Sequence, residues 1–404
     1  MSDAAIPPRL SAALTPSTIS AGFLAVLISY AGPLLIYLQA ARAMQIPEEV
    51  FSSWVFAISM AAGLSTLALS LWARAPVITA WSAPGTALLI AIGTGLPMAE
   101  ITGAYIIAAL TILAIGLTGL FDRLVRALPA PVSAGMMAGI LFSFGVNAMA
   151  ALGTAPVAFL ILLTVFLLLR VLTPGLAVIG VLVLALGLTR FLYDIPLTGI
   201  GFHAPRLVVT VPEWSFAATL GLAVPLIIVT LSGQFLPGMA ILRANGYDLP
   251  ARPIIVLTAL ISVPAALLGG ITTALASITI AFCASPEADA DPQRRYGAGV
   301  ACGLFYCLGA VLAGSVVTLI TLLPQNIVAM LAGFALLGAI QKSLSDTLAP
   351  DDGAQAGLLS FMVTASGVNL FGISAAFWGV IAGLAAWHIG RIGRRLARRS
   401  RLPG

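Results

Sequence analysis

Apolar runs of about 20 residues, separated by short polar breaks, recur along the whole chain. As a helix, a run of this length spans the hydrocarbon core of a bilayer. Because 60% of the 404 residues are hydrophobic and only 8% are charged, an ordinary soluble domain is excluded. The pattern predicts an all-α polytopic membrane protein.

We expect fourteen membrane segments in two halves of seven. The first half, residues 18–190, holds the predicted segments 18–40, 50–72, 76–94, 99–121, 131–149, 155–170 and 174–190. The second half, residues 215–390, holds the predicted segments 215–241, 252–268, 270–284, 296–320, 324–342, 354–369 and 372–390. Residues 1–17 precede the first half, residues 191–214 link the halves, and residues 391–404 form a basic tail.

The basic residues test this count. With the N-terminus in the cytoplasm, sixteen of the nineteen Lys and Arg residues fall on the cytoplasmic side, and Arg42, Arg190 and Arg206 fall outside. Lys and Arg concentrate on the cytoplasmic side, and a missed segment would invert all sides downstream. We therefore expect a multi-pass protein of a bacterial-type inner membrane, with both termini cytoplasmic and the 191–214 linker extracytoplasmic.

Internal repetition points in the same direction. Met136-Met-Ala-Gly139 matches Met330-Leu-Ala-Gly333 after 194 residues (330 − 136), and Ile78-Thr-Ala80 matches Ile271-Thr-Thr-Ala274 at nearly the same shift. A unit of seven segments crosses the membrane an odd number of times, so its copy lies inverted. Inverted repeats are typical of secondary transporters.

Residues 76–91 are apolar but do not read as one spanning helix. Pro76 and the β-branched residues 77–79 favour an extended start, whereas Ser82 suits an N-cap and Pro84 a first helical turn. The prediction is a short strand followed by a half-helix that begins in mid-membrane. Such a helix start suits an anionic ligand, and irregular backbone at that depth is tolerated only inside protein or around a cavity.

Three further segments are predicted to be interrupted. Segment 10, residues 270–284, mirrors the broken segment 3, and its Gly269-Gly270 pair allows close backbone approach. Segments 1 and 8 carry mid-membrane interruptions at residues 29–33 and 232–238, the latter with a Pro237-Gly238 break.

Five stretches between residues 79 and 379 carry a resemblance to a known family: Thr79-Ala-Trp-Ser-Ala-Pro-Gly85, Ser285-Pro-Glu-Ala288, Met330-Leu-Ala-Gly-Phe-Ala-Leu-Leu337, Val363-Thr-Ala-Ser-Gly367 and Ala376-Phe-Trp-Gly379. In these motifs the chain resembles the benzoate/proton symporter (BenE) family. The resemblance implies a uracil-permease-like fold in which segments 1, 3, 8 and 10 line the site, and segments 3 and 10 carry short strands. It also implies secondary active import of benzoate or a related aromatic carboxylate with protons, by alternating access. Relatives of this fold are often dimers, so a homodimer is a further expectation.

Those four segments supply the candidate substrate-binding residues, which are Ser29, Tyr30, Trp81, Ser82, Ala83, Gly85, Thr86, Gly233, Gln234, Thr273, Ala276, Ser277 and Thr279. Their hydroxyl, amide and backbone N–H groups could hold a carboxylate, and the rings of Tyr30 and Trp81 could wall an aromatic body. Structural roles stay open beside these: a kinked helix in segment 3, small-residue packing in segment 10, and a lipid- or helix-facing Trp81.

No acidic side chain is placed to carry a proton through the membrane. All fourteen acidic residues lie in termini, loops or segment ends. Nucleobase relatives of this fold carry site glutamates in segments 8 and 10, whereas segment 8 here offers Gln234. Two hypotheses remain: the proton travels on the substrate's own carboxylate, or on a segment-end group such as Glu287.

Two other functions are compatible with the sequence: a transporter of the same fold for an inorganic anion or a nucleobase, and an anion channel. No enzyme is expected, because no membrane segment brings together a Ser-His-Asp set, a metal cluster or paired carboxylates, and no phosphate-binding Gly-Lys-Ser/Thr loop is present. We expect no cofactor, no metal and no nucleic-acid partner; the expected partners are the aromatic carboxylate, protons and the lipid bilayer.

Overall fold

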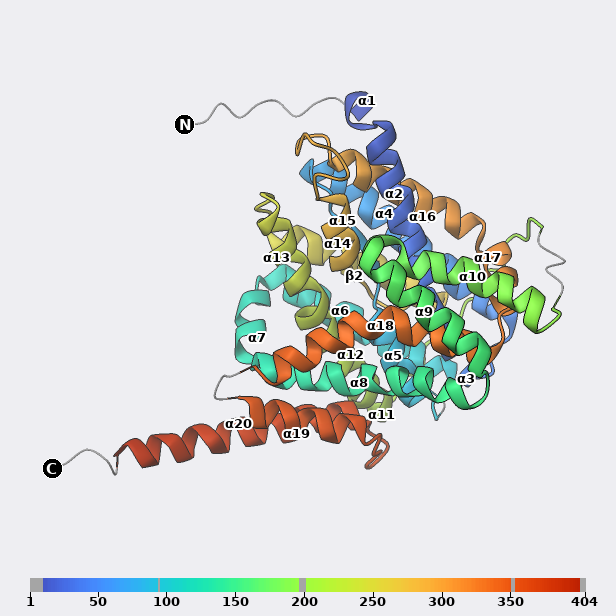
Figure 1. The fold of residues 1–404 in the computed structure, drawn as a ribbon. Helices are drawn as coiled ribbons and strands as arrows, with labels where there is room; N and C mark the ends of the chain where they lie inside the picture. Colours follow the sequence, from blue (N-terminus) through green and yellow to red (C-terminus); the bar gives the residue numbers. More distant parts are fainter. Residues whose placement is uncertain (1–9, 94, 196–200, 350–352, 400–404) are drawn as a thin grey trace, which may run out of the picture.

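The computed structural model describes residues 10–93, 95–195, 201–349 and 353–399 (Figure 1). The first half of the chain forms α1 (Leu10–Ala13), α2 (Pro16–Ala31), α3 (Pro33–Ala43), α4 (Glu48–Ala73), β1 (Thr79–Trp81), α5 (Ala83–Gly93), α6 (Met98–Thr118), α7 (Phe121–Ala127), α8 (Ala130–Ala150), η1 (Ala151–Gly153), α9 (Pro156–Leu172), η2 (Pro174–Leu176) and α10 (Ala177–Leu192). The second half forms α11 (Phe216–Ala218), η3 (Thr219–Ala223), α12 (Val224–Thr230), η4 (Leu231–Phe235), α13 (Leu236–Ala244), α14 (Ala251–Leu267), β2 (Thr273–Leu275), α15 (Ser277–Cys283), α16 (Tyr296–Val311), α17 (Ala313–Thr321), α18 (Gln325–Thr347), α19 (Ala354–Ala365) and α20 (Ala375–Arg399).

Within the described ranges, seven helical stretches are long and apolar enough to cross a bilayer: Pro16–Ala43, Glu48–Ala73, Met98–Thr118, Ala130–Gly153, Phe216–Ala244, Gln325–Thr347 and Ala375–Ile392. An eighth is counted when α16 and α17 are taken as one bent span. Four shorter apolar helices accompany them: Pro156–Leu172, Ala177–Leu192, Ala251–Leu267 and Ala354–Ala365. The protein is therefore an all-α polytopic membrane protein, and in the described part of the chain its two strands form the short sheet described next.

Strands β1 and β2 form a buried antiparallel sheet inside the helices. At its centre Ala80 faces Ala274, which lies 194 residues later (274 − 80). This is the shift that separates the two Met-x-Ala-Gly motifs (330 − 136). Two strands related by a two-fold axis pair antiparallel about that axis, so the register agrees with the inverted repeat expected from the sequence.

The strands are anchored in matching ways in the two halves. The N–H of Thr79 donates to the Thr66 hydroxyl on α4 at 2.9 Å, and the N–H of Thr273 donates to the Ser262 hydroxyl on α14 at 2.9 Å. The hydrogen bonding between the strands continues one residue beyond the sheet, since the Ser82 N–H donates to the Thr272 carbonyl. These bonds satisfy backbone donors that water does not reach at this depth.

Helices of the two halves interleave around the sheet. α2 and α4 of the first half pack against α16 of the second, and α8 packs against α18 and α19. Figure 1 shows this for α2, drawn in blue beside the orange α16. A core built this way places the sheet where both halves meet.

Segment ends that the charge map assigns to one side lie together. In the linker, Val208 N–H donates to the Ser53 hydroxyl, and His203 N–H donates to the Ser315 hydroxyl. At the opposite end, the Thr15 hydroxyl donates to Asp289. These contacts join segment ends that are far apart in the sequence.

Segment 11 differs from its prediction. The predicted segment 296–320 is not one straight helix, because the chain bends by 73° between α16 and α17. The bend falls at Leu312, and just beyond it Gly314 packs so closely on the His203 carbonyl that a Cβ would overlap it. A contact with the linker, which is remote in sequence, therefore lies directly beside the bend.

The interruption predicted at residues 232–238 of segment 8 is present as a π turn, η4, and not as a break at Pro237-Gly238, which lies inside α13. The helical stretch from Phe216 to Ala244 contains a second π turn, η3. Each π turn is followed by a helix with proline at its second position, Pro225 or Pro237. A proline lacks an N–H and crowds the carbonyl four residues back, and the wider π turn accommodates both effects.

Two helix boundaries also differ. α20 continues to Arg399, nine residues past the predicted end of segment 14 at residue 390, so most of the predicted basic tail is helical (399 − 390). The short α7, between segments 4 and 5, is not predicted from the sequence.

Candidate functional site

The half-helix α5 begins directly after β1, deep inside the protein. The Ser82 hydroxyl accepts the N–H of Gly85 at 3.0 Å, so the predicted N-cap is confirmed. The Ser82 carbonyl accepts the Thr86 N–H and hydroxyl, at 2.8 and 2.9 Å. Since Pro84 has no N–H, these contacts leave the N–H of Ala83 as the first-turn donor available to a ligand.

The first turn of α5 is tightly enclosed. A Cβ on Gly85 would come within 2.5 Å of Leu226 Cδ1 and 2.9 Å of Ile271 Cδ1. Segment 8 and the start of segment 10 therefore cover this helix start, and a larger residue at position 85 would displace the cap.

Replacing Ser82 by alanine is expected to lower the free energy of unfolding by about 1 kcal/mol, because the Gly85 N–H loses its partner. Equilibrium unfolding in mixed detergent micelles, with SDS as denaturant, measures this change. Ser82→Thr keeps the hydroxyl and is the matched control. An unchanged stability in Ser82→Ala would contradict a capping role.

The second half-helix is shorter. α15 begins at Ser277 and has seven residues, and the Thr279 hydroxyl donates to the Ala276 carbonyl at 2.9 Å. Ala276 and Ser277 are half-buried at its start. The predicted strand-then-half-helix arrangement is thus present in both segments 3 and 10.

Three aromatic rings gather beside β1. The Tyr30 ring centroid lies 5.9 Å from that of Trp81 and 6.2 Å from that of Tyr306, and Trp81 lies 6.1 Å from Tyr306. The Tyr306 hydroxyl donates to Ser29 at 2.5 Å, and the Tyr30 hydroxyl lies 2.7 Å from that of Ser59. Ser29 and Tyr30 are therefore held at the site by hydroxyl contacts.

Tyr306 of α16 was missed by sequence reasoning, which placed only segments 1, 3, 8 and 10 at the site. The signal available was a tyrosine within the small-residue run of segment 11, from Gly297 to Gly309. A buried phenol needs a hydrogen-bond partner, and this requirement makes a tyrosine in such a run a candidate for a polar contact inside the protein.

Three candidate side chains keep a buried polar atom without a partner among the described residues: Trp81 Nε1, Thr273 Oγ1 and Gln234 Oε1. Trp81 and Thr273 are directly opposite in the sheet register, so their side chains lie on the same face. An unpaired buried polar group costs about 1–3 kcal/mol. Three more such atoms belong to Trp54, Tyr105 and Thr364, on segments 2, 4 and 13.

Gln234 lies in the π turn η4, which packs against β2. Only 8% of the residue is exposed. Its neighbour Gly233 faces α8, where a Cβ would overlap Met137 Cε. Segment 8 therefore presents the Gln234 amide at the sheet through a turn of the kind often found at functional sites.

Glu287 lies apart from these residues. It is exposed in the loop between α15 and α16. The seven residues of α15, at about 1.5 Å each, already place roughly 10 Å between the sheet and this loop. The structure brings Ser29, Tyr30, Trp81 and Thr273 to one region, but it does not bring Glu287 there.

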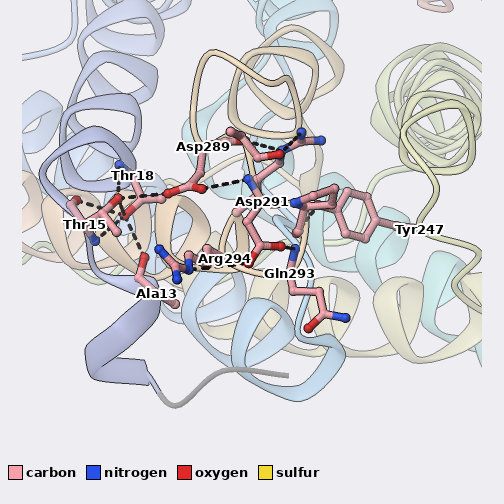
Figure 2. A network of polar contacts seen from close by, with 11 residues as sticks. Ala13, Thr15, Thr18, Tyr247, Asp289, Asp291, Gln293 and Arg294 are labelled. Carbon is pink, nitrogen blue, oxygen red and sulfur yellow. Dashed lines mark hydrogen bonds and ion pairs between the residues drawn. The ribbon is translucent and has the colours of Figure 1, made fainter. Parts of the chain in front are cut away.

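The acidic neighbours of Glu287 hold the loop in place (Figure 2). Asp289 accepts the Thr15 hydroxyl at 3.2 Å and the Asp291 N–H at 2.9 Å, and Asp291 pairs with Arg294. The Tyr247 hydroxyl donates to the Pro292 carbonyl at 2.7 Å, and burial raises the pKa of Tyr247.

Arg295, only 6% exposed, donates to the Ala284 carbonyl at the end of α15 and to the Asp289 carbonyl. The loop therefore connects the second half-helix to the start of α2.

Solved structures share this fold. The chain aligns with SLC26A9 at a TM-score of 0.62 and 14% identity, covering 93% of this chain and 66% of that one. It aligns with the transmembrane domain of the cyanobacterial bicarbonate transporter BicA at a TM-score of 0.55 and 15% identity, covering 91% and 97%. At these identities the similarity establishes the architecture alone.

Sequence relatives extend over nearly the whole chain. A "Benzoate membrane transport protein" of Acinetobacter baylyi is 45% identical over 373 residues, covering 92% of this chain and 95% of the relative. The "Inner membrane protein YdcO" of Escherichia coli K12 is 39% identical over 370 residues, with the same coverage. The model of the benzoate membrane transport protein family, BenE, matches residues 12–389. The chain therefore belongs to the benzoate membrane transport protein (BenE) family, a family of membrane transporters and not of enzymes.

Proposed function

We propose that this transporter imports benzoate or a related aromatic carboxylate together with protons, by alternating access around the β1–β2 sheet. The observation that carries the proposal is the pair of unpartnered donors, Trp81 Nε1 and Thr273 Oγ1, on one face of the sheet. A carboxylate accepts hydrogen bonds from both. The rings of Tyr30, Trp81 and Tyr306 supply an apolar wall for an aromatic body.

Binding of the anion depends on whether hydrogen bonds offset the free-energy cost of placing its charge inside the membrane. A full charge at the bilayer centre costs about 2.5–3.5 kcal/mol on the mild insertion scale. Hydrogen bonds to a charged group contribute roughly 1.5–3 kcal/mol each, and the start of α5 adds about 0.3–2 kcal/mol toward an anion. Two side-chain donors and the Ala83 N–H therefore offset the penalty, with Ser277 and the start of α15 as the corresponding elements of the second half.

The Gln234 amide suits a substrate that carries its own proton. In one orientation its NH₂ donates to a carboxylate, and in the other its carbonyl oxygen accepts the O–H of a carboxylic acid. A site without a carboxylate side chain can thus bind both protonation states. We favour this route over Glu287 because Glu287 lies in an exposed loop at the far end of α15.

We further propose that the seven or eight long spans, the shorter apolar helices and the two broken elements together make fourteen crossings. Both termini are then cytoplasmic and the 191–214 linker is extracytoplasmic. The relative named as an inner membrane protein supports placement in an inner membrane. Residues 196–200 of the linker lie outside the described residues.

The test is uptake of labelled benzoate into proteoliposomes under an inward proton gradient. We expect saturable accumulation that disappears when the gradient is collapsed, and a Glu287→Gln variant that accumulates benzoate like the wild type. Conductance without saturation would indicate a channel, and competition by bicarbonate or uracil in place of benzoate would indicate a different substrate. Loss of gradient-driven uptake in Glu287→Gln would instead identify Glu287, in the loop after α15, as the proton carrier.

A further inference from the structure

A cavity of about 370 Å³ lies at the end of α3 that the proposed topology places outside. Its lining is Leu38, Ala41, Arg42, Gln45, Ile46, Glu48, Phe51 and Thr321. The chain turns at Gln45, with φ of 55°, so the end of α3 and the start of α4 form facing walls. The volume lies within the range of about 300–1,000 Å³ that is usual for small-molecule sites.

Arg42 differs from the other two arginines assigned to this side. Arg190 pairs with Asp194, and Arg206 pairs with Glu49. In the described part of the chain, no carboxylate lies within ion-pair distance of Arg42. Its Nη2 donates to the carbonyls of Thr321 and Leu323, at 2.9 and 2.8 Å, which fixes the guanidinium at the cavity and leaves its Nε and Nη1 donors.

The remaining lining is mixed: Gln45, Glu48 and Thr321 are polar, and the apolar residues other than Ile46 are almost fully buried behind the cavity surface. Leu38 and Phe51 are each 1% exposed, and the Phe51 ring packs against Tyr37 and Trp54 of the core. Glu48 is the one acidic side chain in the lining and stands opposite Arg42 on the start of α4. A fixed guanidinium with its Nε and Nη1 donors left over is the chemistry that binds a carboxylate.

We propose that this cavity is an outer recognition site, where Arg42 binds the carboxylate of an incoming aromatic acid before it reaches the sheet. The inference rests on the proposed import of an aromatic acid. α3 also packs against α5, so the helix that carries Arg42 borders the half-helix of the central site. Glu48 opposes the incoming anion and limits how tightly it is held there, which favours onward release.

The test measures the KM and kcat of benzoate uptake from the linker side of oriented proteoliposomes. Arg42→Gln is expected to raise KM about 3- to 10-fold, with kcat within twofold, because one charge-assisted contact to the external substrate is lost. Glu48→Gln is expected to lower KM about twofold, since a repelling charge leaves the cavity while Arg42 and its carbonyl contacts remain. A purely structural role of Arg42 predicts no such opposite pair.

Arg190→Gln is the matched control, because it removes the same charge from the same side but outside the cavity. Its KM should equal that of the wild type. An equal rise in Arg190→Gln, or an unchanged KM in Glu48→Gln, would overturn the proposal. So would an Arg42→Gln effect that appears only in vesicles with anionic phosphatidylglycerol, which would identify a lipid headgroup site. If the wild type itself takes up no benzoate, the proposed function fails first.

Discussion

Replacing Thr273 by valine is expected to lower benzoate uptake about 10- to 100-fold while leaving the folded protein as stable as the wild type or more stable. The hydroxyl is buried and has no partner among the described residues, so the apolar isostere removes an unpaired polar atom. If that hydroxyl donates to the substrate carboxylate, its loss costs roughly 1.5–3 kcal/mol of binding, and each 1.4 kcal/mol is about tenfold. Uptake kinetics and thermal unfolding in detergent, measured on the same preparation, check both halves.

Thr79 is the matched control, because it stands at the corresponding position of β1, 194 residues earlier (273 − 79). Its hydroxyl is fully used: it lies 2.6 Å from that of Ser65 and 2.8 Å from that of Thr66, and it also reaches the Ala62 carbonyl. Thr79→Val should therefore lose about 1–3 kcal/mol of stability, with uptake per folded molecule within twofold of the wild type.

The two threonines thus have opposite expected effects despite their symmetric positions. A Thr273→Val protein that is destabilised but transports normally would show that its hydroxyl has a structural partner. The proposed substrate site would then lose its strongest support.

The local part of the central site could be predicted because its signals are local. Pro76 and three β-branched residues favour a strand, and Ser82 with Pro84 favours a helix start, so β1 and α5 were expected close to where they lie. The 194-residue repeat then carried the same expectation to β2 and α15. No long-range information was needed for either prediction.

The features that the sequence did not predict depend on contacts between distant segments. The bend at Leu312 lies beside the contact of Gly314 with His203, and Tyr306 reaches Ser29 where α16 packs on α2. The prolines in segment 8 predict a local irregularity of the helix but do not tell whether it is a break or a π turn. A break and a π turn both accommodate proline, and the packing of η4 against β2 is visible only in the fold.

Replacing Gly269 by alanine is expected to destabilise the protein by about 2–5 kcal/mol, enough to remove most folded transporter from the membrane. Gly269 has φ of 84°, which costs an L residue about 1–2 kcal/mol. An added Cβ would also overlap the buried Trp54 ring, and overpacking of this kind costs about 1–3 kcal/mol more. The carbonyl of the same residue accepts the Tyr37 hydroxyl at 2.5 Å, so displacement of the turn would disturb a second buried side chain. Unfolding in mixed micelles gives the size of the loss.

Gly119→Ala separates the two contributions, because Gly119 has φ of 70° and nothing within 4 Å of an added Cβ. It should lose only the backbone cost of about 1–2 kcal/mol. In a double-mutant cycle, Trp54→Leu should relieve part of the Gly269→Ala penalty, with a coupling of at least about 1 kcal/mol. If the stability effects of Gly269→Ala and Trp54→Leu were strictly additive, or if Gly119→Ala and Gly269→Ala lost equal stability, the Trp54 ring would move aside without cost. The turn at Gly269 would then be too flexible to hold β2 in a fixed position at the centre of the transporter.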